Sequence, residues 1–201
     1  MERKDALNAY IADYRNRLLN LFDLINIEEL EALIATIITA FKNGNTLFIA
    51  GNGGSAATAS HMQADFTFFV RYFTKFRPRV IALTDNIPII TAISNDNSFD
   101  DIFVEQMRGI FNLGDVLLSI SASGNSKNVV KATLLAKELG GKAICFVGFQ
   151  GGKLKEICDI ALFTPNDKGD YGPIEDLHMI LDHMIVNYLS KDEEFLAIPE
   201  R

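Results

Sequence analysis

Short apolar runs alternate with longer amphipathic stretches along most of this chain. Runs of bulky apolar residues bounded by turn residues indicate buried strands at residues 46–50, 79–83, 116–120, 142–147 and 159–164. Apolar residues at helical spacing predict helices between and after them, at residues 55–69, 87–93, 99–111, 129–139, 151–157 and 173–189. Strands that alternate with helices form parallel β–α–β units. The pattern therefore predicts an α/β fold, a three-layer doubly wound parallel sheet with helices on both faces.

Two amphipathic helices are predicted ahead of the first strand. The first covers residues 3–24, and the second begins after the N-cap Asn26, with Glu29 in capping-box position, and ends at Gly44. They can pack on the domain itself, but so much apolar surface favours another subunit as the partner for part of it. The expected division of the chain is N-terminal helices that contribute to an oligomer interface, a main domain and a frayed tail, at residues 1–45, 46–190 and 191–201.

Composition and charge narrow the class of protein. Of the 201 residues 48% are hydrophobic, which suits a single folded domain and excludes disorder, and the formal net charge of −7 argues against direct binding of nucleic acid. No apolar run is long enough to span a bilayer, and the N-terminus lacks the apolar core of a signal peptide. Cys145 and Cys158 lie in apolar surroundings without metal-ligand spacing. These features predict a cytoplasmic protein with reduced cysteines.

A glycine-rich loop, residues 51–56, lies between the first predicted strand and its helix. Its glycines allow a ligand to approach bare backbone, and a helix N-terminus favours an anion such as phosphate. The alternative is a tight turn capped by Ser55. No lysine follows the glycines and Ala56 stands where a third spaced glycine would complete a dinucleotide fingerprint, so no nucleotide cofactor is expected.

A serine-rich loop follows the third predicted strand. Ser121, Ser123 and Ser126 present hydroxyl groups around Gly124 at the start of a helix, a neutral cradle for a phosphate monoester. Ordinary helix capping is the alternative. Both loops leave the carboxyl ends of parallel strands, where ligands bind in such sheets, so we expect them to form one anion site.

Two pairs of histidine and carboxylate residues could flank that site. His61 and Asp65 are four apart on one helix, whereas Glu175 and His183 point in directions that differ by roughly 80° on the last helix. His178 points elsewhere and is expected to be a surface or interface histidine. The pairs suit general acid–base chemistry on a sugar phosphate, or a divalent metal with mixed nitrogen and oxygen ligands.

The spaced motifs resemble those of a known family over nearly the whole chain. They are Gly51-Asn52-Gly53-Gly54-Ser55, His61, Asn95-Asp96, Gly114-Asp115, the serine loop through Val129, Gly151-Gly152-Lys153-Leu154, and His178 with His183. The set resembles the sugar isomerase (SIS) domain, and within it the phosphoheptose isomerase branch. The resemblance implies a cytoplasmic homotetramer with sites at subunit interfaces. It also implies conversion of sedoheptulose 7-phosphate to D-glycero-D-manno-heptose 7-phosphate for heptose biosynthesis.

The resemblance also assigns roles by position. Substrate-binding roles fall on Asn52, Gly53, Gly54, Ser55, Asn95, Asp96, Ser121, Ala122, Ser123, Ser126 and Glu175. Zinc, one ion per site where family members bind it, would be held by His61, Asp65, Glu175 and His183. Asp65 and His183 would be the acid–base pair of an enediol mechanism, with Glu175 as a further catalytic group.

The sequence departs from the family pattern at residues predicted to carry out the proton transfer or to bind the metal. The family has Glu at position 65 and Gln at 175, and Asp65 is shorter by about 1.5 Å. Ala122 replaces the usual Thr, and Phe69 stands where an Arg is expected, with Arg71 two residues further on. The alternative function is therefore a non-catalytic phosphosugar-binding or regulatory protein of the type that associates with the replication initiator. The retained imidazole and carboxylate groups favour an enzyme.

Overall fold

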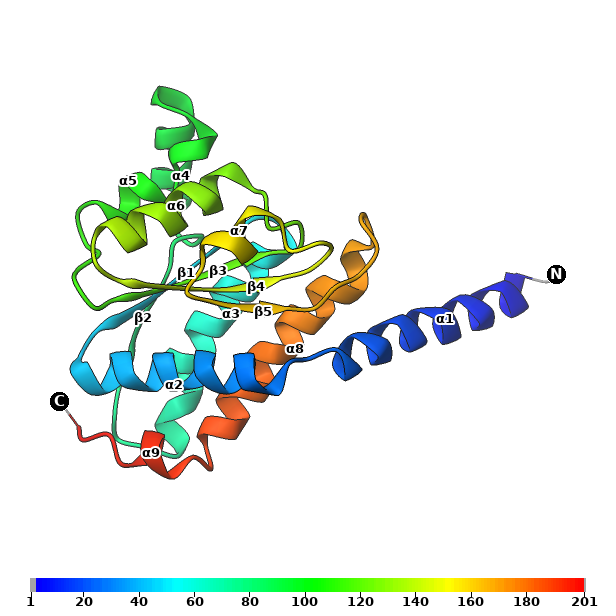
Figure 1. Cartoon of the computed structure of the whole chain (residues 1–201), viewed down its shortest axis with the longest axis horizontal. Coiled ribbons are helices and arrows are strands. Elements are labelled where there is room, and N and C mark those ends of the chain that lie inside the picture. The colour runs from blue at the N-terminus through cyan, green and yellow to red at the C-terminus, as the bar shows by residue number, and fades with distance from the viewer. Residues whose placement is uncertain (1–2, 201) are drawn as a thin grey trace.

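The computed structural model describes residues 3–200 and confirms the predicted α/β class. Five parallel strands form one sheet in the order β2-β1-β3-β4-β5 (Figure 1). The strands are β1 Thr46–Gly51, β2 Arg79–Ala82, β3 Val116–Ser121, β4 Lys142–Val147 and β5 Ile160–Phe163. Ala50 of β1 lies beside Ser119 of β3, so the two strands end level with each other.

Helices cover both faces of the sheet. One face carries α2 Ile27–Asn43, α3 Gly54–Phe68 and α8 Tyr171–Leu189, and the other carries α6 Lys127–Glu138 and α7 Gly152–Ile157 (Figure 1). The alternation along β1 explains this arrangement. Leu47 and Ile49 belong to the core beneath the sheet, whereas Phe48 and Ala50 belong to the core above it. Each strand is therefore buried on both sides, as a parallel sheet requires.

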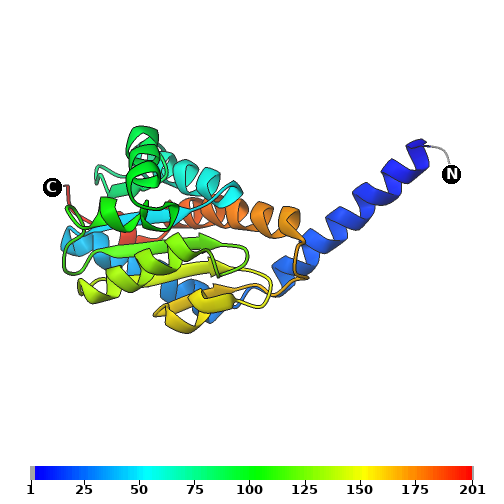
Figure 2. The same cartoon turned by 90° about the horizontal axis from the view of Figure 1, so that it is seen from above.

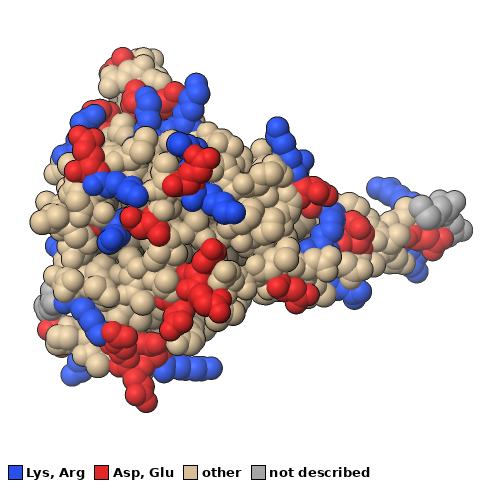
Figure 3. Space-filling model, in the orientation of Figure 1, with Lys and Arg blue, Asp and Glu red and all other residues tan. Residues whose placement is uncertain are grey.

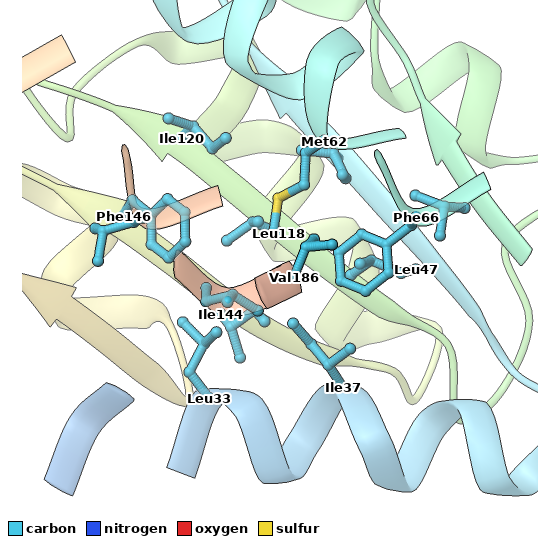
Figure 4. Packing of buried hydrophobic residues seen from close by; sticks show 14 of the residues in the cluster. Leu33, Ile37, Leu47, Met62, Phe66, Leu118, Ile120, Ile144, Phe146 and Val186 are labelled. Atoms are coloured by element: carbon cyan, nitrogen blue, oxygen red, sulfur yellow. The ribbon is translucent and has the colours of Figure 1, made fainter. Parts of the chain in front are cut away.

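The larger core lies between the sheet and α2, α3 and α8. Figure 4 shows Leu33 and Ile37 of α2 pointing toward the sheet, with Met62 and Phe66 of α3 beside them. All four side chains are at most 1% exposed. Burying a side chain of this kind stabilises the fold by about 1.5–3 kcal/mol, so this layer fixes α2 and α3 against the strands.

The predicted boundaries of α2 are confirmed by its caps. The Asn26 side chain accepts a hydrogen bond from the Glu29 backbone N–H at 3.1 Å, and Gly44 ends the helix in the left-handed conformation. The Glu29 carboxylate in turn accepts from the Phe163 N–H at 3.3 Å. This contact ties the start of α2 to the edge strand β5.

The segment after β2 differs from the prediction. Helix α4 extends over Ile87–Asp96 without the expected interruption, and the predicted helix at residues 99–111 is only a 3₁₀ turn, η2 Phe99–Asp101, followed by the short α5 Val104–Met107. The amide of Gln106 donates to the carbonyl oxygens of Leu83 and Ile102. This contact holds the segment of η2 and α5 against the residue that follows β2.

Helix α1, Arg3–Asp23, projects from the body of the molecule (Figures 1 and 2). Its base is held by the Tyr14 hydroxyl, which donates to Asp176, and by Arg17, which pairs with Asp170, each at 2.5 Å. Of its residues only Leu21 is buried, and apolar side chains along its length are exposed. Figure 3 shows this arm and the mixture of acidic and basic side chains on the visible face.

The C-terminal tail is not frayed, contrary to the prediction. After α8 the chain forms α9, Glu193–Leu196, and the Phe195 side chain is fully buried against Phe41 and Phe76. The remaining element is the 3₁₀ turn η1, Phe69–Tyr72, which ends α3. Within residues 3–200, no helix has the length and apolarity needed to cross a membrane.

Candidate functional site

The two predicted loops meet where the sheet changes direction. Strands β1 and β3 are neighbours, but the helix after β1 covers one face and the helix after β3 covers the other. In open α/β sheets, such a switch point opens a crevice beyond the carboxyl ends of the strands, where ligands bind. The glycine loop follows β1 and the serine loop follows β3, so both border this crevice.

The serine loop brings its hydroxyl groups together. The Ser121 Oγ lies 3.4 Å from both the Ser123 Oγ and the Ser126 Oγ, and it accepts a hydrogen bond from the Gly124 N–H at 3.1 Å. Ser126 is the N-cap of α6, yet its side chain makes no capping hydrogen bond. The three hydroxyl groups and the backbone N–H groups at the helix N-terminus can therefore all donate hydrogen bonds to one anion.

A close backbone approach holds this loop in shape. Gly124 has φ of 65°, and a Cβ there would collide with the carbonyl oxygen of Gly151. The Leu154 N–H donates to the Gly124 carbonyl oxygen at 2.9 Å, which ties the loop to α7. The motif Gly151-Gly152 thus supports the serine loop from behind.

The glycine loop is tied to the serine loop by a pair of amides. Asn52 and Asn128 each donate to the other's side-chain oxygen at 2.9 Å, and Asn128 is buried at the start of α6. Gly53 precedes α3 and is exposed, whereas Ser55 is buried in the first turn. Asn52 is therefore engaged with α6, and Gly53 is the part of this loop most open to a ligand.

The other predicted substrate residues belong to the serine loop and to α4. Ala122 is buried beneath the serine loop, and its carbonyl oxygen accepts from the Gly148 N–H. Asn95 and Asp96 form the exposed last turn of α4, where the Asn95 amide donates to the Asp96 carboxylate at 2.8 Å. Their contact with a sugar stays a prediction.

Acid–base groups converge between α3 and α8, which pack side by side (Figures 1 and 2). His61, Asp65, Asp182 and His183 place one donor atom each within 4.8 Å of one another. The His61 Nδ1 lies 3.0 Å from Asp182 Oδ2 and 3.8 Å from Asp65 Oδ2. The His61 and His183 rings meet edge to face, with centroids 4.9 Å apart. Three of the four predicted metal-site residues are thus together, although they are far apart in sequence.

Glu175, the fourth residue predicted for that set, lies elsewhere. Its carboxylate rests against Gly54 at the start of α3, so close that a Cβ on Gly54 would collide with it. Burial, and then the neighbouring Asp176, raise the pKa of Glu175. The structure therefore associates Glu175 with the glycine loop.

Asp182 takes part in the cluster, but the sequence analysis missed it. Its side chain is fully buried, and this burial raises the pKa of its carboxyl group, an effect that the hydrogen bond with His61 opposes. A sequence signal existed: position 182 continues the apolar stripe through Ile174 and Leu181 on α8. A carboxylate on a buried stripe is a functional candidate.

His178 lies on the same stripe and is not a surface histidine, contrary to the prediction. Its ring is 1% exposed and packs on Phe146 of β4, with centroids 5.8 Å apart. Among the residues that the structure describes, its Nδ1 has no hydrogen-bond partner. Burial lowers the pKa of His178 to about 3, so this residue is a neutral part of the core.

Comparisons with known proteins agree with this architecture. The SIS domain family model matches residues 9–148. The chain is 40% identical over 166 residues to the phosphoheptose isomerase of Aliarcobacter butzleri, which covers 82% of this chain and 86% of that protein. It is also 40% identical over 173 residues to a probable phosphoheptose isomerase of Thermoplasma acidophilum, which covers 85% and 91% of the two chains.

Solved structures show the same relationship. Phosphoheptose isomerase GmhA from Neisseria gonorrhoeae matches with a TM-score of 0.84 at 29% identity, over 94% of this chain and 99% of that one. A phosphoheptose isomerase from Francisella tularensis matches with a TM-score of 0.83 at 26% identity, over 96% and 100% of the two chains. The similarity spans the sheet, both loops and the helices that carry the cluster.

Proposed function

The chain belongs to the SIS-domain family as an isomerase related to the phosphoheptose isomerases, and we propose that it converts sedoheptulose 7-phosphate to D-glycero-D-manno-heptose 7-phosphate. The single observation that carries this proposal is the convergence of Asp65 and His183, whose reactive atoms lie within 4.8 Å of each other on different helices. An aldose–ketose exchange needs two such groups.

The phosphate end of the substrate is assigned to the serine loop. Ser121, Ser123 and Ser126 supply hydroxyl groups and α6 supplies free backbone N–H groups, so a dianion would be bound without a lysine or arginine. The carboxylate of Glu175 already lies at the N-terminus of α3. An anion would therefore be repelled from the glycine loop and would settle on the serine side of the crevice.

The reacting end is assigned to Asp65 and His183. The carboxylate of Asp65 takes the proton from one carbon of the substrate, and the imidazole of His183 supplies a proton to the carbonyl oxygen. Asp65 then returns the proton to the adjacent carbon of the enediol, and His183 takes back a proton from the hydroxyl group on the first carbon, which becomes the aldehyde. His183 is exposed and Asp65 is half-buried, so neither side chain is closed off from a substrate.

A divalent metal fits the cluster chemically. Imidazole nitrogens and carboxylate oxygens are the donors that zinc accepts, and one buried oxygen of Asp182 has no partner among the described residues. A zinc ion held by His61, Asp65 and His183 would act as a Lewis acid on the carbonyl oxygen of the sugar.

The proposed assembly is a cytoplasmic homotetramer with sites at subunit interfaces. Exposed apolar residues on α1, among them Leu7, Tyr10 and Ile11, each more than half exposed, support an oligomer. Light scattering after size exclusion measures the mass, and a monomer at micromolar concentration would contradict this part of the proposal.

The isomerase activity is tested with sedoheptulose 7-phosphate and shorter ketose phosphates as substrates. Asp65→Asn and His183→Gln should each lower kcat by roughly 100-fold or more, because each removes one proton-transfer group. Asp167→Asn, an exposed carboxylate outside the crevice, is the matched control. If the wild-type protein turns over none of these sugars, the proposal is wrong.

A further inference from the structure

Asp182 is an unusual residue for the middle of a helix that packs on the core. Its side chain is completely buried, one residue before the exposed His183. Its Oδ2 lies 3.0 Å from the His61 Nδ1, while its Oδ1 is also buried and has no hydrogen-bond partner among the described residues. Each free oxygen of a buried carboxylate costs free energy unless a donor or a cation satisfies it.

The surroundings of Asp182 are suited to a cation. His61 and Asp65 from α3 and Asp182 and His183 from α8 provide two nitrogen and two oxygen donors. The two carboxylates carry a combined formal charge of about −2 when ionised, which a divalent ion would neutralise. His61 has a side chain that is 43% exposed, so an ion can enter the cluster from solvent.

The spacing of the donors is close to that of a zinc site. Zinc bonds of about 2.0–2.1 Å in tetrahedral geometry place neighbouring donor atoms about 3.4 Å apart. The His61 Nδ1 lies 3.0 Å from Asp182 Oδ2 and 3.8 Å from Asp65 Oδ2, on either side of that value. The other separations in the set are at most 4.8 Å, and the exposed His183 has room to rotate toward the other three donors.

Glu175 could join the cluster of His61, Asp65 and His183 only if its carboxylate left its position against Gly54. It precedes His183 by eight residues, which is about 12 Å along the axis of α8. Its carboxylate lies against Gly54, the first residue of α3, whereas His61 and Asp65 lie about two and three turns further along that helix. Asp182 is already beside His61.

We infer that Asp182 is the fourth metal ligand of this chain, in the place that the sequence analysis gave to Glu175. The donor set is then His61, Asp65, Asp182 and His183, and its metal is a divalent ion of the zinc type. Glu175 then stays beside the glycine loop and does not bind the metal. The inference deepens the proposed function, since two of the four ligands, Asp65 and His183, are also the proposed acid–base pair, but metal binding can be measured without turnover.

The test compares Asp182→Asn with Glu175→Gln, two conservative changes from carboxylate to amide on the same helix. Metal-free wild-type protein should bind one zinc ion per chain in competition with a chromophoric chelator. Asp182→Asn should weaken zinc binding by roughly 100-fold. Loss of a residue that only hydrogen-bonds a metal ligand lowers affinity by about 10- to 100-fold, and loss of a direct ligand should cost at least as much. Glu175→Gln should bind within about threefold of wild type, because the removed charge lies outside the ligand set.

Cobalt substitution gives a second readout. The intensity and position of the visible cobalt bands report the ligand set, so they should change in Asp182→Asn and stay unchanged in Glu175→Gln. If Asp182→Asn fails to fold by circular dichroism, Asp182→Glu replaces it. The extra methylene moves the carboxylate by about 1.5 Å and should alter the same bands.

Two results would overturn the inference. One is a wild-type protein that binds no divalent ion, and the other is a loss of zinc affinity in Glu175→Gln with full affinity in Asp182→Asn. Turnover of sedoheptulose 7-phosphate is measured separately. A protein that binds zinc through Asp182 but does not isomerise this sugar would contradict the proposed substrate and leave the ligand set intact.

Discussion

The buried His178 should make the stability of the protein depend on pH in a specific way. Burial holds its pKa at about 3 in the folded protein, against an ordinary value of 6.5. Above pH 6.5 the ring is neutral in both states, and its contribution to stability is complete. As the pH falls below 6.5, the unfolded chain binds a proton that the native state does not, so stability is lost until the pH reaches about 3.

The size of this effect follows from the shift. Between about pH 7 and about pH 5 the loss is about 2 kcal/mol, since each pH unit below the unfolded pKa costs about 1.4 kcal/mol. Replacement by leucine, His178→Leu, removes the titrating group and should remove this part of the pH dependence. The side chain is 1% exposed, so solvent screening does not reduce the effect appreciably.

Equilibrium urea unfolding at the two pH values measures the difference directly. Carboxylates elsewhere titrate equally in both proteins, so the free energy of unfolding of wild type minus that of His178→Leu isolates the histidine. This difference should fall by about 2 kcal/mol on acidification. An unchanged difference would show that His178 is solvated or paired, and would refute the reasoning.

Three further predictions concern the phosphate cradle and the tail. Ser126→Ala should raise KM by roughly 10-fold or more with a smaller effect on kcat, since a hydrogen bond to a charged group contributes about 1.5–3 kcal/mol; an unchanged KM would place the phosphate elsewhere. Gly124→Ala should abolish measurable substrate binding, because its Cβ would collide with the Gly151 carbonyl oxygen; Gly109→Ala, with open space at its Cβ, is the control. Phe195→Ala should lower the free energy of unfolding by about 3–5 kcal/mol; a loss below 1 kcal/mol by urea unfolding would mean that α9 is not docked.

The sheet and the two loops could be predicted from sequence because their causes are local. Apolar strands and the turn residues that bound them set the alternation of strand and helix, and parallel connections place every strand end at one edge. The convergence of the two loops follows from that rule. The order of the strands adds the switch point between β1 and β3, which the local pattern does not contain.

The partners of His61 could be predicted only in part. The directions of Glu175 and His183 around α8 differ by roughly 80°, which allows one shared pocket, but direction ignores the rise of about 12 Å between them along the axis. His178 and Asp182 fall on the buried stripe of the same helix, and this spacing was available in the sequence. Helical spacing would have predicted their burial, but the neighbour of each depends on how α8 packs on α3 and β4.

Two other differences arise from long-range packing. Phe195 is buried against Phe41 and Phe76, which are far away in sequence, so the order of the tail could not be read from its own polar residues. The helix predicted at residues 99–111 is replaced by η2 and α5, and the Gln106 amide of α5 donates to the carbonyl oxygen of Leu83, which follows β2. In both cases tertiary contacts override local propensity.

Proton exchange with solvent during turnover tests the central claim most directly. With sedoheptulose 7-phosphate in deuterium oxide, an enediol mechanism at Asp65 and His183 predicts deuterium at the second carbon of the aldose product, detected by proton NMR. Asp65→Asn should form this product at least roughly 100-fold more slowly while still binding the sugar phosphate. Undiminished turnover in Asp65→Asn, or no aldose product from the wild-type protein, would contradict the account.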